Sequence, residues 1–204
     1  TLWMSKPKQL GRFDVFIQEI DLAGRTIVDA GAGLADLAAY LIEQGIEYER
    51  CIALEGVQAM AEQAALRNFL RTRVEHVDFA AHADVYERIN DEERAAGGQP
   101  IGVILFSGSL NTFQQEHALQ QVQRAWDVAS HAVGFNFLST RHHKRNPVNP
   151  APAVRFDPVH ILDWALARTP AALVRQDYFE GHDCTCIMWK QGEVIERRWV
   201  QGAN

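Results

Sequence analysis

The most constraining feature of this chain is a regular alternation of short apolar runs with helix-like segments. Five runs have the length and composition of buried strands, at 25–30, 51–54, 74–77, 101–106 and 132–138. A segment with apolar residues at helical spacing, or a charged helix-like segment, follows each of the first four runs. Such an alternation folds as a parallel sheet with helices on both faces. The sequence therefore predicts an α/β chain.

The alternation ends after residue 138. Residues 139–157 form a polar stretch with three prolines, and a helix is expected from Pro158. Two further strand-like runs, 172–178 and 183–190, are separated by Gly181, which is typical of an antiparallel hairpin. The predicted fold is a Rossmann-like, doubly wound, mostly parallel seven-stranded sheet that ends in this hairpin. We expect one domain, with a cap segment over 1–24, a core over 25–190 and a tail over 191–204.

Composition narrows the classes of function. The net charge is -6, whereas a protein that binds a nucleic-acid backbone usually has a basic surface. No apolar run approaches the roughly 18–20 residues that a membrane helix needs, and the first ten residues hold no apolar signal core. We therefore expect a cytoplasmic protein with no membrane contact. Three cysteines, an odd number, favour no disulfide framework.

A glycine-rich turn follows the first predicted strand. Asp29 is the last polar residue of that strand, and Gly31 and Gly33 lead into a helix. Glycines at such a turn permit positive φ and a close approach of a ligand to the backbone. The following helix N-terminus offers free N–H groups and the positive end of the helix dipole, which suit a carboxylate or a phosphate.

Acidic residues also end the next two predicted strands. Glu55, about 20 residues after the turn, is placed to accept hydrogen bonds from both hydroxyls of a ribose. Asp78 ends the third strand and Phe79 follows it, so the carboxylate and a neighbouring backbone N–H are placed to meet an adenine ring. Because the carboxyl ends of parallel strands share one edge of a sheet, these groups predict a nucleoside site there.

These residues resemble the class I S-adenosylmethionine-dependent methyltransferases over about residues 26–190. The segment 28–37 is similar to the glycine-rich first motif of that superfamily, Glu55 to its ribose-binding acid and Asp78 to its adenine-site acid. The closing hairpin is also typical of that superfamily. The resemblance implies S-adenosylmethionine as cofactor and methyl transfer as the reaction.

A narrower resemblance is to bacterial methyltransferase-like proteins of unassigned substrate. They share a W-x-S-x-x-x-Q-x-x-R-F pattern, an S-G-x-x-N segment after the fourth strand and an F-N-F-L segment in the fifth. The matching residues here are Trp3, Ser5, Gln9, Arg12 and Phe13, then 107–111, then 135–138. This resemblance implies that Ser107 contributes to the cofactor pocket. Two interpretations of the N-terminal pattern stay open: a lid in which Arg12 pairs with the cofactor carboxylate, or an ordinary amphipathic cap helix.

Candidates for the acceptor side are weaker. Asn111 and Asn136 are expected near the carboxyl edge of the sheet, where each either binds substrate or makes a structural hydrogen bond. His142 and His143, flanked by Arg141, Lys144 and Arg145, are the candidates for a general base, and a solvated loop is the alternative.

Several subclasses do not fit. Ser107 and Ser139 stand where metal-dependent catechol-type enzymes need acids, so no metal is expected, and the base-methylation motifs of DNA enzymes are missing. A small-molecule or saccharide-like acceptor is therefore expected.

Two alternatives to a methyltransferase stay open. One is a non-catalytic methyltransferase-fold binding module, because Ala35 replaces a frequent third glycine. The other is a nicotinamide-dependent oxidoreductase, although Asp36 interrupts its G-x-G-x-x-G fingerprint.

Overall fold

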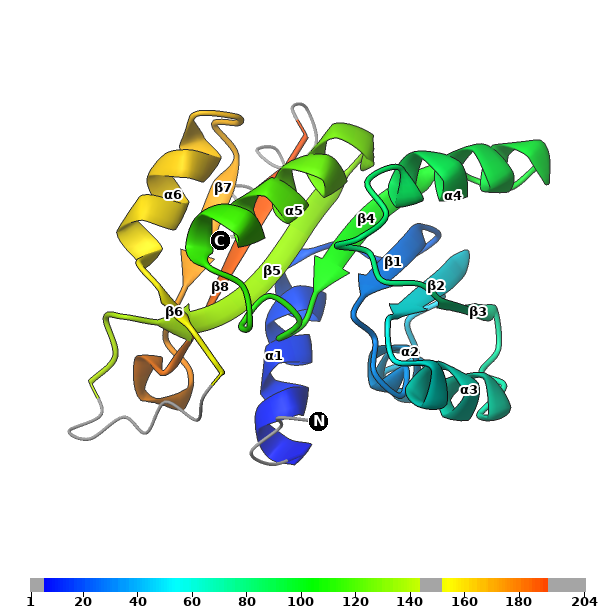
Figure 1. The fold of residues 1–204 in the computed structure, drawn as a ribbon, viewed down its shortest axis with the longest axis horizontal. Coiled ribbons are helices and arrows are strands. Elements are labelled where there is room, and N and C mark those ends of the chain that lie inside the picture. The colour runs from blue at the N-terminus through cyan, green and yellow to red at the C-terminus, as the bar shows by residue number, and fades with distance from the viewer. Residues whose placement is uncertain (1–5, 144–151, 191–204) are drawn as a thin grey trace, which may run out of the picture.

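A central twisted sheet separates two layers of helices in this computed structural model, which describes residues 6–143 and 152–190 (Figure 1). The strands are β1 (Thr26–Ala30), β2 (Arg50–Glu55), β3 (Thr72–His76), β4 (Ile101–Phe106), β5 (Ala132–Ser139), β6 (Arg155–Phe156), β7 (Ala172–Arg175) and β8 (Asp183–Trp189). The helices are α1 (Lys6–Glu19), α2 (Asp36–Glu43), α3 (Gln58–Leu66), α4 (Val85–Ala95), α5 (Gln115–Val128), α6 (Pro158–Leu166) and the short 3-10 helix η1 (Phe179–Gly181).

The sheet is mostly parallel. Its main path has the order β3-β2-β1-β4-β5-β8-β7, in which β1 to β5 pair in parallel. Strand β8 runs antiparallel to both of its neighbours, β5 and β7. The predicted doubly wound sheet with a closing antiparallel hairpin is confirmed. Strand β8 lies inside the sheet, so its first residues reach the edge at which the parallel strands end.

Two hydrophobic clusters cover the two faces of the sheet. Tyr86 of α4 and Ile161 of α6 belong to one cluster, together with Val28 of β1. Phe16 of α1 and Leu41 of α2 belong to the other, on the opposite face. Because side chains alternate between the faces of a strand, each buried strand supplies apolar residues to both clusters.

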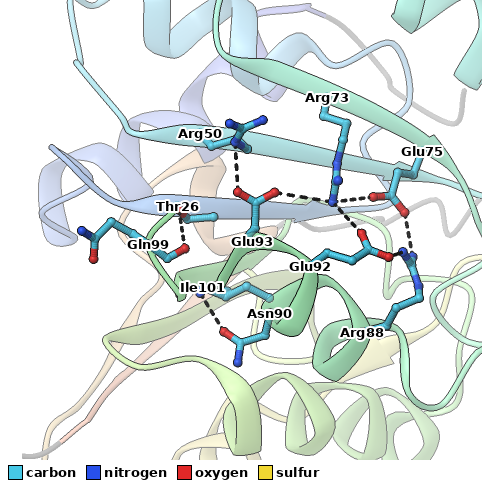
Figure 2. Close-up of polar contacts among 10 residues, drawn as sticks. All are labelled: Thr26, Arg50, Arg73, Glu75, Arg88, Asn90, Glu92, Glu93, Gln99 and Ile101. Carbon is cyan, nitrogen blue, oxygen red and sulfur yellow. Dashed lines mark hydrogen bonds and ion pairs between the residues drawn. The ribbon is translucent and has the colours of Figure 1, made fainter. Parts of the chain in front are cut away.

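The amino edge of the sheet is held by a network of ion pairs (Figure 2). The buried Glu93 of α4 contacts Arg50 Nε of β2 at 3.0 Å and Arg73 Nη2 of β3 at 3.6 Å. Arg88 joins the same helix to Glu75 of β3 at 2.7 Å. The Glu93 contacts fix the end of α4 across the first residues of β2 and β3, opposite to the carboxyl edge, and the Arg88 contact ties the helix to the far end of β3.

Three local features differ from the expectations. Strand β6 lies in the stretch predicted as a loop, and makes an eighth strand that pairs with Leu138 and the end of β5. The apolar spacing predicts a helix over about 57–70, but α3 ends at Leu66, and Asn68 and Arg71 after it have positive φ. Strand β7 ends at Arg175, three residues earlier than expected. The last two differences are at element boundaries, where apolar periodicity carries little information, and β6 has only two residues, too few to show a periodicity.

The N-terminal segment contains α1, which packs on the face of the sheet shared by α2. Trp3 and Ser5 of the N-terminal pattern and the tail 191–204 lie outside the described residues. Within the described ranges, none of the helices combines the length and apolar character that a membrane crossing requires.

Candidate functional site

The glycine turn connects β1 to α2 at the carboxyl edge of the sheet. Gly31 and Gly33 have φ of +81° and +59°, values that favour glycine. A Cβ on Gly31 would also collide with Ser109, whose Oγ donates to the Ala30 carbonyl oxygen at 2.5 Å. The loop after β4 therefore rests directly on the turn, and glycine is needed for both conformation and space.

Glu55 organises the backbone around this turn. Its Oε2 accepts a hydrogen bond from the Gly33 N–H and its Oε1 accepts one from the Val57 N–H, both at 2.8 Å. The residue is 8% exposed. Because a carboxylate oxygen accepts more than one hydrogen bond, these contacts leave acceptor capacity for hydroxyl groups of a ligand.

Asp29 is a buried acid without a hydrogen-bond partner at one oxygen. It is 3% exposed, and its Oδ1 makes no hydrogen bond within the described part of the chain. Burial, together with the nearby carboxylates of Glu55 and Asp36, raises the pKa of Asp29 to about 7. A cation or a strong donor at this oxygen would stabilise the ionised form.

A cavity of about 190 Å³ lies between the glycine turn and α1. Its walls come from α1, from the turn and from the ends of β1 and β4. The lining residues are Lys6, Gln9, Phe13, Asp29, Gly31, Ala32, Gly33, Leu34, Asp36 and Ser107. The unpartnered Oδ1 of Asp29 belongs to a lining residue, and so does the Ser107 Oγ, which is also buried without a partner among the described residues.

Asp36, the first residue of α2, links α1 to this cavity. It contacts Lys6 Nζ at 3.3 Å, accepts from Gln9 Nε2 at 3.0 Å and accepts from Arg67 Nη1 at 2.8 Å. Burial alone would raise the pKa of Asp36, but the hydrogen bonds from Arg67 and Gln9 hold it below its ordinary value. Asp36 therefore stays ionised and holds the polar side of α1 against the start of α2.

The expected adenine-site residues lie beside the end of β2. Asp78 is exposed, its Oδ1 accepts from the Ala80 N–H at 2.9 Å, and it lies next to Gly56. The Phe79 ring is buried, 5.5 Å from the Phe106 ring in an edge-on contact. Only the backbone of Phe79 is thus placed to meet a ligand, while the Asp78 carboxylate is accessible.

No protein-family model and no curated protein matches the chain by sequence. Solved structures do match it in three dimensions. The methyltransferase domain of bacterial CtHen1-CN has a TM-score of 0.64 at 12% identity, covering 90% of this chain and 99% of that one. Magnesium protoporphyrin IX methyltransferase from Synechocystis PCC 6803 with bound SAH has a TM-score of 0.63 at 10% identity, covering 90% and 82%. A SAM-dependent methyltransferase from Aquifex aeolicus has a TM-score of 0.59 at 13% identity, covering 87% and 88%.

The chain has the class I S-adenosylmethionine-dependent methyltransferase fold. The resemblance stated from the glycine turn, the strand-end acids and the closing hairpin is confirmed at the level of the fold. In this methyltransferase fold the turn, Glu55 and Asp78 share the carboxyl edge of the sheet.

Arg12 does not line the cavity of this methyltransferase fold. Its Nη2 donates to Asp183 Oδ1 at 2.8 Å, in a pair with both side chains buried. The α1 residues that reach the cavity are Lys6 and Gln9. Sequence reasoning named Gln9 as part of a lid but missed Lys6, although a spacing of three residues puts both on one side of a helix.

The two expected substrate-binding asparagines hold loops in place. Asn136 Oδ1 accepts from the Gly108 N–H at 2.7 Å, and Asn111 Oδ1 accepts from the Leu138 N–H at 3.3 Å. Asn136 is fully buried, and its Nδ2 has no partner among the described residues. One atom of Asn136 is therefore structural and the other is free.

His142 and His143 lie in the loop after β5 and do not line the cavity. The His143 N–H donates to the Glu180 carbonyl oxygen at 3.3 Å, and Arg141 Nη2 pairs with Asp157 at 3.4 Å. Lys144 and Arg145 lie outside the described residues. A catalytic role for the two histidines stays a prediction. In the part of the chain that the structure describes, no group of three His, Cys, Asp or Glu residues could hold a metal ion.

Proposed function

We propose that this protein is an S-adenosylmethionine-dependent methyltransferase that acts on a small acceptor. The observation that carries the proposal is Asp29, a buried carboxyl group with a free oxygen in a cavity beside the glycine turn. An unpaired buried polar group is costly, so a ligand that pairs with it is the simplest account of its presence.

The donors and acceptors around the cavity match the amino-acid end of the cofactor. That end is a zwitterion, whose ammonium group pairs with Asp29 and whose carboxylate meets Lys6 Nζ, Gln9 Nε2 and the free N–H groups at the start of α2. In this arrangement Lys6 takes the role that the sequence suggested for Arg12. Glu55 accepts from the ribose hydroxyls, and Asp78 accepts from the adenine amine.

The cofactor, when bound, supplies an electrophilic methyl group, so the chain needs no nucleophile of its own. The residues of this chain bind, orient and exclude water. Ser107, the residue after β4, lines the cavity, and its neighbour Gly108 is bonded to Asn136 of β5, so we place the acceptor on this side of the cavity.

Two other functions use the same fold. A non-catalytic binding module would bind the cofactor without transferring its methyl group, so turnover with an acceptor separates it from an enzyme. A nicotinamide-dependent oxidoreductase would bind NAD, but Asp36 occupies the last glycine position of the dinucleotide fingerprint and bonds to α1.

The test is a calorimetric titration with S-adenosylmethionine and S-adenosylhomocysteine. We expect micromolar binding that weakens about ten-fold or more in Asp29→Asn, because a charge-assisted hydrogen bond to the ammonium group is lost. Asp163→Asn, an equal charge change on the exposed side of α6, is the matched control and should bind as the wild type does. Failure of the intact protein to bind either compound would contradict the proposed function.

A further inference from the structure

Polar side chains form a row across the sheet beneath α1. Ile27, Leu105 and Ile187 pack in the cluster that contains α1. Side chains two residues apart in a strand point to the same face of the sheet. Polar residues two positions from these apolar ones therefore also face α1, nearer to the carboxyl edge. We call these residues the polar row: Asp29 of β1, Ser107 after β4, Asn136 of β5, and Asp183 and Thr185 of β8.

The row is continuous across four adjacent strands. Asn136 is the register partner of Thr185, and its Oδ1 binds the Gly108 N–H next to Ser107. Thr185 in turn contacts the Tyr178 hydroxyl at 2.5 Å. Ser107 belongs to the cavity wall, so the row begins in the proposed cofactor cavity and leads away from it toward β8.

Each of four residues in the row has one polar atom without a partner among the described residues. These atoms are Asp29 Oδ1, Ser107 Oγ, Asn136 Nδ2 and Asp183 Oδ2. All four residues are at most 5% exposed. Two of these residues already make a structural hydrogen bond through their other polar atom. Asn136 Oδ1 accepts from the loop after β4, and Asp183 Oδ1 accepts from Arg12. Buried polar groups are normally paired, so free atoms gathered along one row point to a ligand.

We propose that the polar row from Ser107 to Asp183 is the acceptor site and that it binds a small, neutral, polyhydroxylated molecule such as a monosaccharide or a cyclitol. This inference rests on the proposed methyltransferase function. Asn136 Nδ2 only donates, Asp183 Oδ2 accepts, and Ser107 does both. Hydroxyl groups satisfy all three, because each hydroxyl both donates and accepts.

Charge and access support the neutral and small character of the acceptor. The charge of Asp183 is offset by Arg12 at 2.8 Å, so the part of the row from Ser107 to Asp183 offers no net charge to an ionic ligand. Side chains of α1 meet both ends of the row: Gln9 and Phe13 line the cavity together with Ser107, and Arg12 contacts Asp183. All three side chains are buried. A polymer cannot lie across residues buried in this way, whereas a small molecule can approach the row from the cavity that Ser107 lines.

The experiment measures binding of D-glucose, L-rhamnose and myo-inositol by saturation-transfer NMR, with and without S-adenosylhomocysteine. D-glucose 6-phosphate is the charged comparison. Asn136→Asp and Asp183→Asn keep the oxygen that accepts the internal hydrogen bond and change the free atom, and Asp183→Asn also removes the charge that is paired with Arg12. Asn90→Asp is the matched control, because Asn90 Oδ1 accepts from the Ile101 N–H at the opposite edge of the sheet. Thermal unfolding verifies that each variant is folded.

We expect at least one neutral compound to bind more tightly than the phosphate. This binding should weaken about ten-fold or more in Asn136→Asp and Asp183→Asn, while the affinity for S-adenosylhomocysteine and the behaviour of Asn90→Asp stay unchanged. The inference is overturned if none of the neutral compounds binds, if the phosphate binds equally well, or if both row variants bind as the control does. If the wild type does not bind S-adenosylhomocysteine, the methyltransferase function is contradicted instead. The binding of the neutral compounds in the absence of S-adenosylhomocysteine still tests the row in that case.

Discussion

At the level of single residues, the burial of Asp29 links stability to pH. Its pKa is raised from 3.8 to about 7, so ionising this carboxyl costs the folded state more than the unfolded state. The cost is absent below 3.8, grows between 3.8 and about 7, and is complete above that range. The difference corresponds to at most roughly 4 kcal/mol of unfolding free energy.

Asp29→Asn removes this cost, since an amide does not ionise. The unfolding free energy of the variant minus that of the wild type is expected to increase by up to a few kcal/mol as the pH rises from about 4.5 to about 8. Urea unfolding of both proteins at the two pH values measures the gain. Parallel pH profiles would show that Asp29 is solvated or paired in solution.

A second residue-scale prediction concerns packing beneath α1. A Cβ on Gly134 of β5 would lie 2.9 Å from Leu105 Cδ2 and 3.0 Å from Phe16 Cε1. Gly134→Ala is therefore expected to destabilise the protein by about 1–3 kcal/mol through overpacking. Phe16→Leu creates space at the same point, so the double variant should lose less than the sum of the two single losses in chemical denaturation. Additive losses would argue against this contact.

At the level of elements, the apolar runs made the strands predictable. Local motifs made the part of the candidate site around the glycine turn predictable. The sequence places Asp29, Gly31 and Glu55 at the carboxyl edge because positions at strand ends are readable within one β/α unit, and their binding roles stay predictions. The sequence does not single out Lys6 and Asp183, because their positions depend on contacts across the chain, between residues 6 and 36 and between residues 12 and 183. The alternation of Asp183, Thr185 and Ile187 was a usable signal, but only once β8 is known to begin at the carboxyl edge. Strand β6, with two residues, is too short to show a periodicity.

The ion-pair network at the amino edge gives an element-scale prediction (Figure 2). Glu93 is buried between two arginines that are themselves partly exposed, so Glu93→Gln is expected to cost about 1–3 kcal/mol. Glu92→Gln changes a neighbouring, half-exposed carboxylate of the same network and should cost less than about 1 kcal/mol. Equal losses in thermal unfolding would contradict the difference in burial.

At the level of the whole molecule, both hydrophobic clusters share one sheet, so the described core should unfold in one transition. A ligand that binds only the folded state raises the unfolding free energy, by about 2.7 kcal/mol at 100 times its Kd. S-adenosylhomocysteine is therefore expected to raise Tm in differential scanning fluorimetry, and NAD is not. A shift with NAD alone would favour the oxidoreductase over the methyltransferase.

The position of β8 has a consequence for how the molecule is made. Strand β7 is synthesised before β8 but lies outside it, at the edge of the sheet. A growing chain on the ribosome can therefore assemble β1 to β5, but β7 has no partner until β8 emerges and inserts between β5 and β7. The same insertion delivers Asp183 to Arg12, 171 residues earlier in the chain. A chain that stalls before β8 therefore holds the glycine turn and Glu55 but lacks both the central antiparallel strand and the Arg12–Asp183 contact.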